Sequence, residues 1–541
     1  MILFPVLILS LLLTIVLTPL FMRLAARANA YDIPDARKVH HMPIPRVGGI
    51  AMAVSIFIPI LIWSPLETPV RAFLAGALII IVFGLIDDLK GLDFKFKFAA
   101  QITAALVAVL YGGVKIVNLG SLLPDGMVLP NWIAVILTSV AIVGVTNAIN
   151  LADGLDGLAG GISLLIFICI AYLAHLDQNI VIAIIAVAFI GAIFGFLRFN
   201  TYPATLFMGD TGSQLLGFSA AFLSISLTQG NTPLSPLLPL IILGFPVLDT
   251  LTVMGDRIAR GDSPFSADMK HFHHRLVRMG LFHTEAVFVI YVIQAFIIIS
   301  AYVLRFHSDW LLLSGYLVFS GLIVSTIYVA RIKGWALRRF DFIDRAVKGN
   351  LRRLREKGFF IRFIFQPLEI CAPMLLILIC FLPAQIPRYF AIVSSVIVIV
   401  FGMVWYLRRE WAKGFLILML YLLIPPLVYV CETNTALWTN ITLRRLYNLS
   451  FLFFAALSFI TLRLTRRKAG FKITPMDFLV LFVALGLFLL PDLRAQFGAM
   501  AMNVIMLFFI FEIILGEVRE KIGKVALLTI AACVVVAVRG F

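Results

Sequence analysis

A short polar segment interrupts the long apolar stretches of this chain. Residues 147–158 read Asn-Ala-Ile-Asn-Leu-Ala-Asp-Gly-Leu-Asp-Gly-Leu, which groups two amides, Asn147 and Asn150, with two carboxylates, Asp153 and Asp156. Polar and ionisable groups are costly beside membrane-spanning stretches and are usually kept there for a function. We therefore expect this segment to form part of a functional site.

Three further polar clusters lie at the ends of other apolar stretches. They are Asp87-Asp88, Gly209-Asp210-Thr211-Gly212 and His271-Phe272-His273-His274-Arg275. Oxygen ligands with no cysteine among them suit Mg²⁺, with Mn²⁺ as the alternative, rather than zinc. Because Mg²⁺ usually fills its remaining positions with water and substrate phosphate oxygens, a diphosphate substrate is the natural partner. Helix N-termini expected near residues 158 and 212 would offer amide donors to such an anion.

The composition indicates where these clusters must lie. Of the 541 residues, 62% are hydrophobic and 13% are charged, whereas soluble domains are roughly 45–50% apolar. Apolar runs of about 20 residues match the bilayer's hydrocarbon thickness of about 30 Å, so we expect an all-α polytopic membrane protein. The formal charge of +16 then reflects lysine and arginine in cytoplasmic loops rather than nucleic-acid binding.

The apolar runs predict about 11 transmembrane helices in residues 1–335. We place them near residues 3–22, 48–64, 69–86, 98–113, 131–147, 159–174, 180–197, 212–228, 235–254, 284–304 and 310–330. Lysine and arginine are concentrated in alternate connections, which orients those connections to the cytoplasm. All four polar clusters belong to this set. The sequence thus predicts one cytoplasm-facing, Mg²⁺-dependent site for a phosphorylated substrate, placed where a lipid can also enter.

Four motifs follow one another along residues 1–335. They read Asp32-x-Pro34-x-x-Arg37-Lys38-x-His40-x-x-Pro43-x-Pro45-Arg46-x-Gly48-Gly49, Asp87-Asp88, Asn147-x-x-Asn150-x-x-Asp153-Gly-Leu-Asp156-Gly-Leu158-Ala-Gly and Phe207-Met208-Gly209-Asp210-Thr211-Gly212-Ser213. In this order they resemble the signature motifs of the polyprenyl-phosphate N-acetylhexosamine-1-phosphate transferases. Pro264-Phe265-x-x-Asp268-x-x-His271-x-His273-His274-Arg275 is similar to the branch of that family that uses simple UDP-N-acetylhexosamines, and differs from the branch that uses UDP-MurNAc-pentapeptide.

The resemblance implies a role for each cluster. Asp210 is the implied Mg²⁺ ligand, with Asn150 as the second, although Asn147 and Asn150 could instead join helices by hydrogen bonds. Asp87, Asp88 and Asp210 are the implied catalytic residues, and the aspartate pair holds the lipid phosphate or keeps it deprotonated. A general base is the weaker idea, because a phosphate monoester has a second pKa of about 6. The implied substrate-binding residues are Lys95, Asn147, Asp153, Asp156, His271, His273, His274 and Arg275. Among them, Lys95 would balance the charge of the aspartate pair, with Lys97 as the alternative, and Asp153 and Asp156 would orient the nucleotide. The three histidines and Arg275 would orient the sugar and diphosphate.

The implied reaction transfers N-acetylhexosamine 1-phosphate, with GlcNAc favoured, from a UDP-sugar to undecaprenyl phosphate. It releases UMP and starts a lipid-linked glycan for a cell-envelope polysaccharide such as O-antigen. The implied location is the bacterial inner membrane, among membrane lipids, with a homodimer and downstream glycosyltransferases as further partners. Two alternatives stay open: a multi-span transporter of a lipid-linked or anionic solute, and a phospho-MurNAc-pentapeptide transferase. The transporter fits less well, because transporter sites lie near the bilayer midplane and recur in paired halves.

The second half of the chain has no comparable polar constellation. Residues 336–365 are strongly basic, as expected for a cytoplasmic linker in contact with anionic lipid. Residues 366–541 are predicted to form a C-terminal extension with about seven more transmembrane helices. We place these near residues 366–383, 389–407, 414–430, 447–463, 477–490, 498–515 and 523–538. The hypothesis for this extension is a docking or lipid-handling module for downstream glycan assembly.

Overall fold

The chain forms two compact units of helices. The computed structural model describes residues 2–28, 30–32, 43–124, 127–230, 232–263, 271–334, 359–433, 441–464, 499–518 and 522–541. One unit holds the described residues up to 334, and the other holds those from 359 onward. The four polar clusters all belong to the first unit.

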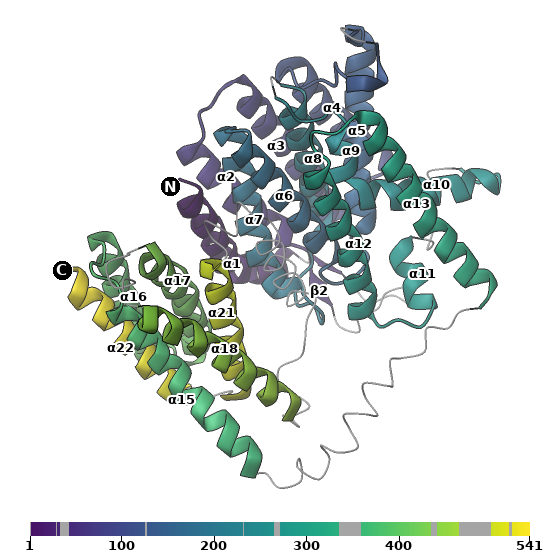
Figure 1. The fold of residues 1–541 in the computed structure, drawn as a ribbon. Coiled ribbons are helices and arrows are strands. Elements are labelled where there is room, and N and C mark those ends of the chain that lie inside the picture. The colour runs from purple at the N-terminus through teal and green to yellow at the C-terminus, as the bar shows by residue number, and fades with distance from the viewer. Residues whose placement is uncertain are drawn as a thin grey trace. The chain divides into compact units, whose positions relative to one another are not determined.

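The first unit consists of helices that stand side by side, together with one short β ladder (Figure 1). Its elements are α1 (Leu3–Ala28), β1 (Tyr31–Asp32), β2 (Ile44–Pro45), α2 (Gly48–Trp63), α3 (Thr68–Lys90), α4 (Phe94–Leu106), the π-helical turn η1 (Val107–Tyr111), the 3₁₀ turn η2 (Gly120–Leu122), α5 (Asn131–Ala152), α6 (Leu158–Leu176), α7 (Ile180–Asn200), α8 (Gly209–Thr228), α9 (Leu238–Ile242), α10 (Gly244–Ala259), α11 (Phe272–Arg278), α12 (His283–Val303) and α13 (Asp309–Ile332). The strands β1 and β2 pair antiparallel, with Tyr31 opposite Pro45, and are a small exception to the expected all-α fold.

The second unit is also helical. Its elements are α15 (Phe359–Phe381), α16 (Arg388–Leu407), the 3₁₀ turn η3 (Arg409–Trp411), α17 (Ala412–Thr433), α18 (Ile441–Leu464), α21 (Ala499–Val518) and α22 (Gly523–Gly540). Its core is apolar, since Leu416, Leu420 and Ile424 of α17 are buried together with Leu376 of α15 and Val525 of α22.

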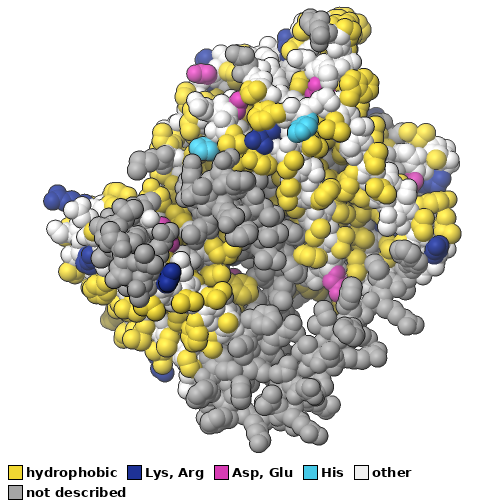
Figure 2. All heavy atoms as spheres, viewed as in Figure 1, with side chains coloured by type: hydrophobic (Ala, Val, Ile, Leu, Met, Phe, Trp, Pro, Cys, Tyr) yellow, Lys and Arg dark blue, Asp and Glu magenta, His cyan; other side chains and the backbone are white. Residues whose placement is uncertain are grey.

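Eleven helices among the described residues are long and apolar enough to cross a membrane. The last three, Arg388–Leu407, Ala412–Glu432 and Gly523–Gly540, belong to the second unit. On the face drawn in Figure 2, hydrophobic side chains cover most of the coloured surface and charged ones are few. The chain is therefore a multi-pass membrane protein, but the roughly 18 transmembrane helices expected from the apolar runs are not all found. The run near residues 477–490 lies outside the described residues.

The helix α8 is too polar to count among these spans, because it does not have to face lipid. It packs against α2, α3, α5 and α6, and nearly all of its residues are buried. Glycines make this packing possible: a Cβ at Gly49 of α2 would collide with the backbone of Gly212, and one at Gly84 of α3 would lie 2.7 Å from Thr211 Cα. Small residues permit this close approach of membrane helices. Other helices thus shield the glycines and hydroxyl side chains of α8.

The transmembrane helix predicted at residues 235–254 is broken into α9 and α10. Pro246 has no N–H, so the carbonyl of Ile242, four residues earlier, loses its helical partner. Gln294 of α12 replaces that partner by donating from Nε2 to Ile242 O at 2.9 Å, and its Oε1 accepts from the N–H of Phe245 at 3.2 Å. The break therefore follows from the proline and is stabilised by one buried glutamine.

Candidate active site

Asp88, in the last turn of α3, caps the first turn of α8. Its Oδ1 accepts from the N–H of Asp210 at 2.8 Å, and its Oδ2 accepts from the N–H and hydroxyl of Thr211 at 3.0 and 2.6 Å. A carboxylate in this place satisfies N–H groups that have no partner inside the helix. Gly209 has φ +69°, and a Cβ there would collide with the Asp88 carboxylate. The N–H groups of Asp210 and Thr211 are thus occupied, and these two are not free to act as the anion donors predicted near residue 212.

The turn between α3 and α4 brings Lys97 back onto the aspartates. Asp93 starts α4 by accepting from the N–H of Lys95 at 2.9 Å. The Nζ of Lys97 then lies 2.5 Å from Asp87 Oδ2 and 2.9 Å from Asp210 Oδ2. Lys95 is exposed and lies two residues away, about 200° around the helix axis. The charge-balancing position predicted for Lys95 therefore belongs to the alternative, Lys97.

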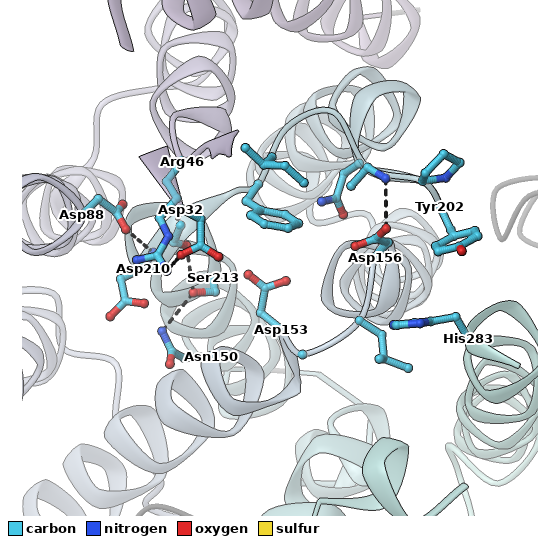
Figure 3. A pocket seen from close by; sticks show the side chains of 18 of the residues that line it. Asp32, Arg46, Asp88, Asn150, Asp153, Asp156, Tyr202, Asp210, Ser213 and His283 are labelled. Carbon is cyan, nitrogen blue, oxygen red and sulfur yellow. Dashed lines mark hydrogen bonds and ion pairs between the residues drawn. The ribbon is translucent and has the colours of Figure 1, made fainter. Parts of the chain in front are cut away.

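A pocket of about 590 Å³ opens beside these contacts, within the range of about 300–1,000 Å³ that is usual for small-molecule sites. The predicted site residues that line it are Asp88, Asn150, Asp153, Asp156, Asp210 and His274. Figure 3 shows Asp88, Asp210 and Asn150 on one side of the pocket and Asp156 on the other, with Asp153 between them. The pocket thus brings together residues of all four clusters, and His274 is the member of the histidine cluster that it includes.

One side of the pocket offers oxygen ligands. Asn150 donates from Nδ2 to Ser213 Oγ at 2.9 Å, and Ser213 donates to the carbonyl of Gly209 at 3.1 Å, which orients the Asn150 amide. Asp210 and Asn150 thus provide the carboxylate and amide oxygens that suit Mg²⁺. Within the described ranges, no group of three or more His, Cys, Asp and Glu side chains forms a ready metal cage. Mg²⁺ does not require one, because it is usually held by one or two carboxylates plus phosphate oxygens. The donor set fits magnesium.

Asn200, the last residue of α7, ties the other side of the pocket together. Its Oδ1 accepts from the N–H of Gly157 at 3.0 Å, and its Nδ2 donates to the carbonyl of Leu206 at 2.9 Å. Asp156 Oδ2 accepts from the N–H of Ala204 at 2.9 Å. The segment after α7 is thereby fixed to the loop between α5 and α6, and the N–H of Gly157, just before α6, is also occupied.

Asp153, just after α5, lies where burial and neighbouring carboxylates disfavour its negative charge. Burial raises the pKa of Asp153 to about 7, and the carboxylates of Asp210 and Asp156 add to the rise. A carboxyl whose ionised form is disfavoured gains from a bound cation or from a hydrogen-bond donor on a ligand. Perturbed groups of this kind that line a pocket are candidates for ligand contacts.

The family follows from comparison with known proteins. The profile of glycosyl transferase family 4 matches residues 70–228, which include Asp88 and Asp210. The chain is 38% identical over 351 residues to the probable undecaprenyl-phosphate N-acetylglucosaminyl 1-phosphate transferase of Bacillus subtilis (strain 168), covering 96% of that protein and 63% of this chain. It is 30% identical over 342 residues to the undecaprenyl-phosphate alpha-N-acetylglucosaminyl 1-phosphate transferase of Escherichia coli (strain K12), covering 90% of that protein and 62% of this chain.

The chain belongs to glycosyl transferase family 4. The resemblance seen in the motifs is thereby confirmed. A third relative, the decaprenyl-phosphate N-acetylglucosaminephosphotransferase of Mycobacterium leprae (strain TN), is 38% identical over 301 residues, covering 75% of that protein and 50% of this chain. In each of these comparisons more than a third of this chain has no counterpart.

In this family 4 chain, most of the histidine cluster lies behind the pocket. The Nδ1 of His271 is 3.0 Å from Asp249 Oδ2, and Asp249 Oδ1 accepts from the backbone N–H of Phe272 at 2.7 Å. His273 is packed against Gly154, and burial lowers the pKa of His273 to about 3, with the charge of His274 adding to the shift. Of this cluster, His274 is the member that lines the pocket. The first two histidines therefore support the pocket wall from behind.

Four other predicted site residues are not part of the pocket lining: Asp87, Lys95, Asn147 and Arg275. Arg275 donates from Nη2 to Asp256 Oδ2 at 2.6 Å, and Asn147 donates from Nδ2 to Gln101 Oε1 at 2.6 Å. The substrate contacts expected of Asn147, Arg275, His271 and His273 stay predictions. The motif positions 33–42 and 264–270 lie outside the described residues.

Several residues that line the pocket were given no site role from the sequence. Asp32 and Arg46 belong to the first motif, and the structure joins them in an ion pair at the β ladder, while the rings of Tyr202 and His283 stack with centroids 5.5 Å apart. The motif includes Asp32 and Arg46, but their contact depends on the pairing of β1 with β2. Asn200 could have been found from the sequence, because it is a polar residue at the end of an apolar helix.

Proposed function

We propose that this family 4 protein transfers N-acetylglucosamine 1-phosphate from UDP-GlcNAc to undecaprenyl phosphate and releases UMP. The observation that best supports this is the placement of Asp210, whose helix is capped by Asp88 and whose carboxylate is paired with Lys97 beside a pocket. The names of the relatives at 30–38% identity supply the sugar and the lipid.

The proposed reaction joins two phosphorylated substrates. An oxygen of the lipid phosphate attacks the β-phosphorus of UDP-GlcNAc, and the bond from that phosphorus to the oxygen bridging the α-phosphorus breaks. The products are undecaprenyl-diphospho-GlcNAc and UMP, which keeps the bridging oxygen. Phosphoryl transfer of this kind depends chiefly on positioning and on neutralising charge. Lys97 supplies a fixed cation between Asp87 and Asp210 for that purpose.

Magnesium, when bound, would neutralise charge on the phosphate oxygens. Asp210 and Asn150 would hold it, with Ser213 orienting the amide. Asp153 and Asp156, across the pocket, would orient the nucleotide. Both oxygens of Asp88 are engaged by α8, so its contribution is to position Asp210 rather than to accept a proton.

We place this site on the cytoplasmic face of a bacterial membrane. The contacts between Asp88 and α8, and between Asn200 and Gly157, show that the helix ends near the polar clusters meet at one end of the first unit. The last turns that reach this end carry Arg27, Lys90, Arg198 and Arg257. Such basic residues favour the cytoplasmic side.

The experiment that tests this function uses purified protein with Mg²⁺, undecaprenyl phosphate and a panel of UDP-GlcNAc, UDP-GalNAc and UDP-MurNAc-pentapeptide. We expect lipid-dependent release of UMP with UDP-GlcNAc, and none from a folded Asp210→Asn variant. Turnover of UDP-MurNAc-pentapeptide alone would assign the chain to the other branch. Absence of lipid-dependent UMP with every sugar would overturn the proposal and favour a transporter.

A further inference from the structure

A row of buried amide side chains runs behind Asp210. Gln214, one turn further along α8, donates from Nε2 to Asp210 Oδ2 at 3.4 Å. The Oε1 of Gln214 accepts from Gln101 Nε2 of α4 at 3.1 Å, and the Oε1 of Gln101 accepts from Asn147 Nδ2 of α5 at 2.6 Å. Gln101 and Gln214 are only 2% and 4% exposed, so their amides depend on each other for hydrogen bonds.

This row continues the ion pair at the pocket. Lys97 and Gln101 are four residues apart on α4, and Asp210 and Gln214 are four residues apart on α8, so each pair shares one face of its helix. Lys97 contacts Asp210, and one turn deeper Gln101 contacts Gln214. Two successive polar contacts therefore join α4 to α8.

The hydrogen bonds of the row can run in only one direction. A carboxylate can only accept, so Gln214 must turn its NH₂ toward Asp210 and its carbonyl toward Gln101. Gln101 must then donate to Gln214, which leaves its own carbonyl for Asn147. Asn147 is fixed in turn, because it donates to the backbone carbonyl of Val143 at 2.8 Å. Both ends of the row are acceptors, and flipping any amide would leave buried polar groups unpaired, which is costly.

We propose that Gln214 and Gln101 are positioning residues for Asp210. Gln214 and Lys97 both approach the same oxygen of Asp210, Oδ2, and so fix the carboxylate in one orientation toward the pocket. The role rests on the proposed function, in which Asp210 holds the metal. Partners that orient a metal-ligating carboxylate typically change metal affinity or activity by about 10–100-fold. Asn147 belongs to the same row, which gives it a role other than the substrate contact predicted for it.

The test uses Gln214→Met, Gln101→Met and the double variant of the full-length protein. There are three readouts. Electron paramagnetic resonance measures Mn²⁺ binding to the substrate-free protein, thermal unfolding gives the Tm, and UMP release gives the turnover. Each single variant should lose about 10–100-fold in Mn²⁺ affinity and turnover. Gln101→Met should also lower the Tm, because the buried carbonyl of Gln214 loses its donor. In the double variant part of the lost Tm should return, since the Gln101–Gln214 contact is then apolar on both sides, while Asn147 keeps only Val143 as an acceptor. Mn²⁺ binding should stay weak because Asp210 still lacks the donor from Gln214.

Gln294→Met is the matched control. Gln294 is fully buried and hydrogen-bonded at the break between α9 and α10, so its loss should lower the Tm without changing Mn²⁺ affinity. A double variant with wild-type Mn²⁺ affinity would show that the row only fills space. Wild-type protein that binds no Mn²⁺, or Asp210→Asn that binds it as tightly as wild type, would also overturn the positioning role. Mn²⁺ binding that depends on Gln214 in a protein without transfer activity would support positioning but contradict the proposed function.

Discussion

Asp88 holds Asp210 through the backbone, by accepting a hydrogen bond from the Asp210 N–H at 2.8 Å. The second oxygen of Asp88 holds Thr211, the next residue of α8. Its neighbour Asp87 instead pairs with Lys97. Two adjacent carboxylates that look alike in the sequence therefore have different tasks: one balances a cation, and the other fixes the helix that carries Asp210.

The cap predicts a specific defect for Asp88→Asn. An amide keeps one acceptor but turns an NH₂ toward a backbone N–H, so the start of α8 should loosen. We expect a loss of about 1–2 kcal/mol in the free energy of unfolding, as for a lost helix cap, and a fall in UMP release of about tenfold or more. Thermal unfolding and UMP assays on the purified variant measure both effects.

Asn179→Ala is the control for this cap. Asn179 caps α7 by accepting from the N–H of Ile182 at 3.2 Å, at the opposite end of that helix from Asn200, and it does not line the pocket, so its loss should cost a similar amount of stability, about 0.5–2 kcal/mol, without loss of transfer. If the activity of Asp88→Asn returned to normal at high pH, where the lipid phosphate is ionised in any case, Asp88 would be a proton acceptor rather than a cap.

The two lysines of α4 should differ sharply when each is replaced by methionine. Lys97→Met removes the cation shared by Asp87 and Asp210, and we expect UMP release to fall by at least about 100-fold, as when a charge-stabilising donor is removed. Lys95→Met changes an exposed side chain and should alter the rate by no more than about twofold. Equal losses in the two variants would contradict the assignment of Lys97.

The helices and the grouping of the polar clusters could be predicted from the sequence, because both depend on local patterns of residues. Apolar runs gave the helices, and the bias of lysine and arginine grouped the polar clusters at one end, because each cluster adjoins its own span. The choice between Lys95 and Lys97 could not be made in this way. It depends on where α4 begins, which Asp93 sets, and a shift of one residue would rotate either side chain by about 100°.

The supporting contacts could not be predicted, because they join residues far apart in the chain. Asn200 reaches Gly157, and Gln294 reaches Ile242, through hydrogen bonds that no spacing rule anticipates. The partner of His271 could not be predicted for the same reason, because Asp249 lies 22 residues earlier in the chain.

The burial of His273 predicts a loss of stability in acid. Burial lowers the pKa of His273 from 6.5 to about 3, so at pH 5 this side chain is protonated in the unfolded chain and neutral in the folded chain. The contribution of the neutral ring to the free energy of unfolding is fully present above pH 6.5. It is lost as the pH falls toward 3, by about 2 kcal/mol at pH 5. His273→Gln should flatten the dependence of the unfolding free energy on pH between 6.5 and 5. An unchanged slope in that variant would show that other groups cause the acid sensitivity.

The second unit should be dispensable for the transfer step itself. The Bacillus subtilis relative aligns over 96% of its own length with only 63% of this chain, and every described residue that lines the pocket belongs to the first unit. We therefore expect a chain ending after residue 358 to release UMP at the wild-type rate when purified. The docking or lipid-handling role proposed for the extension predicts a different result in cells, where the same truncation should lower the yield of the finished glycan. A truncated chain that folds but releases no UMP would instead place part of the catalytic function in the second unit.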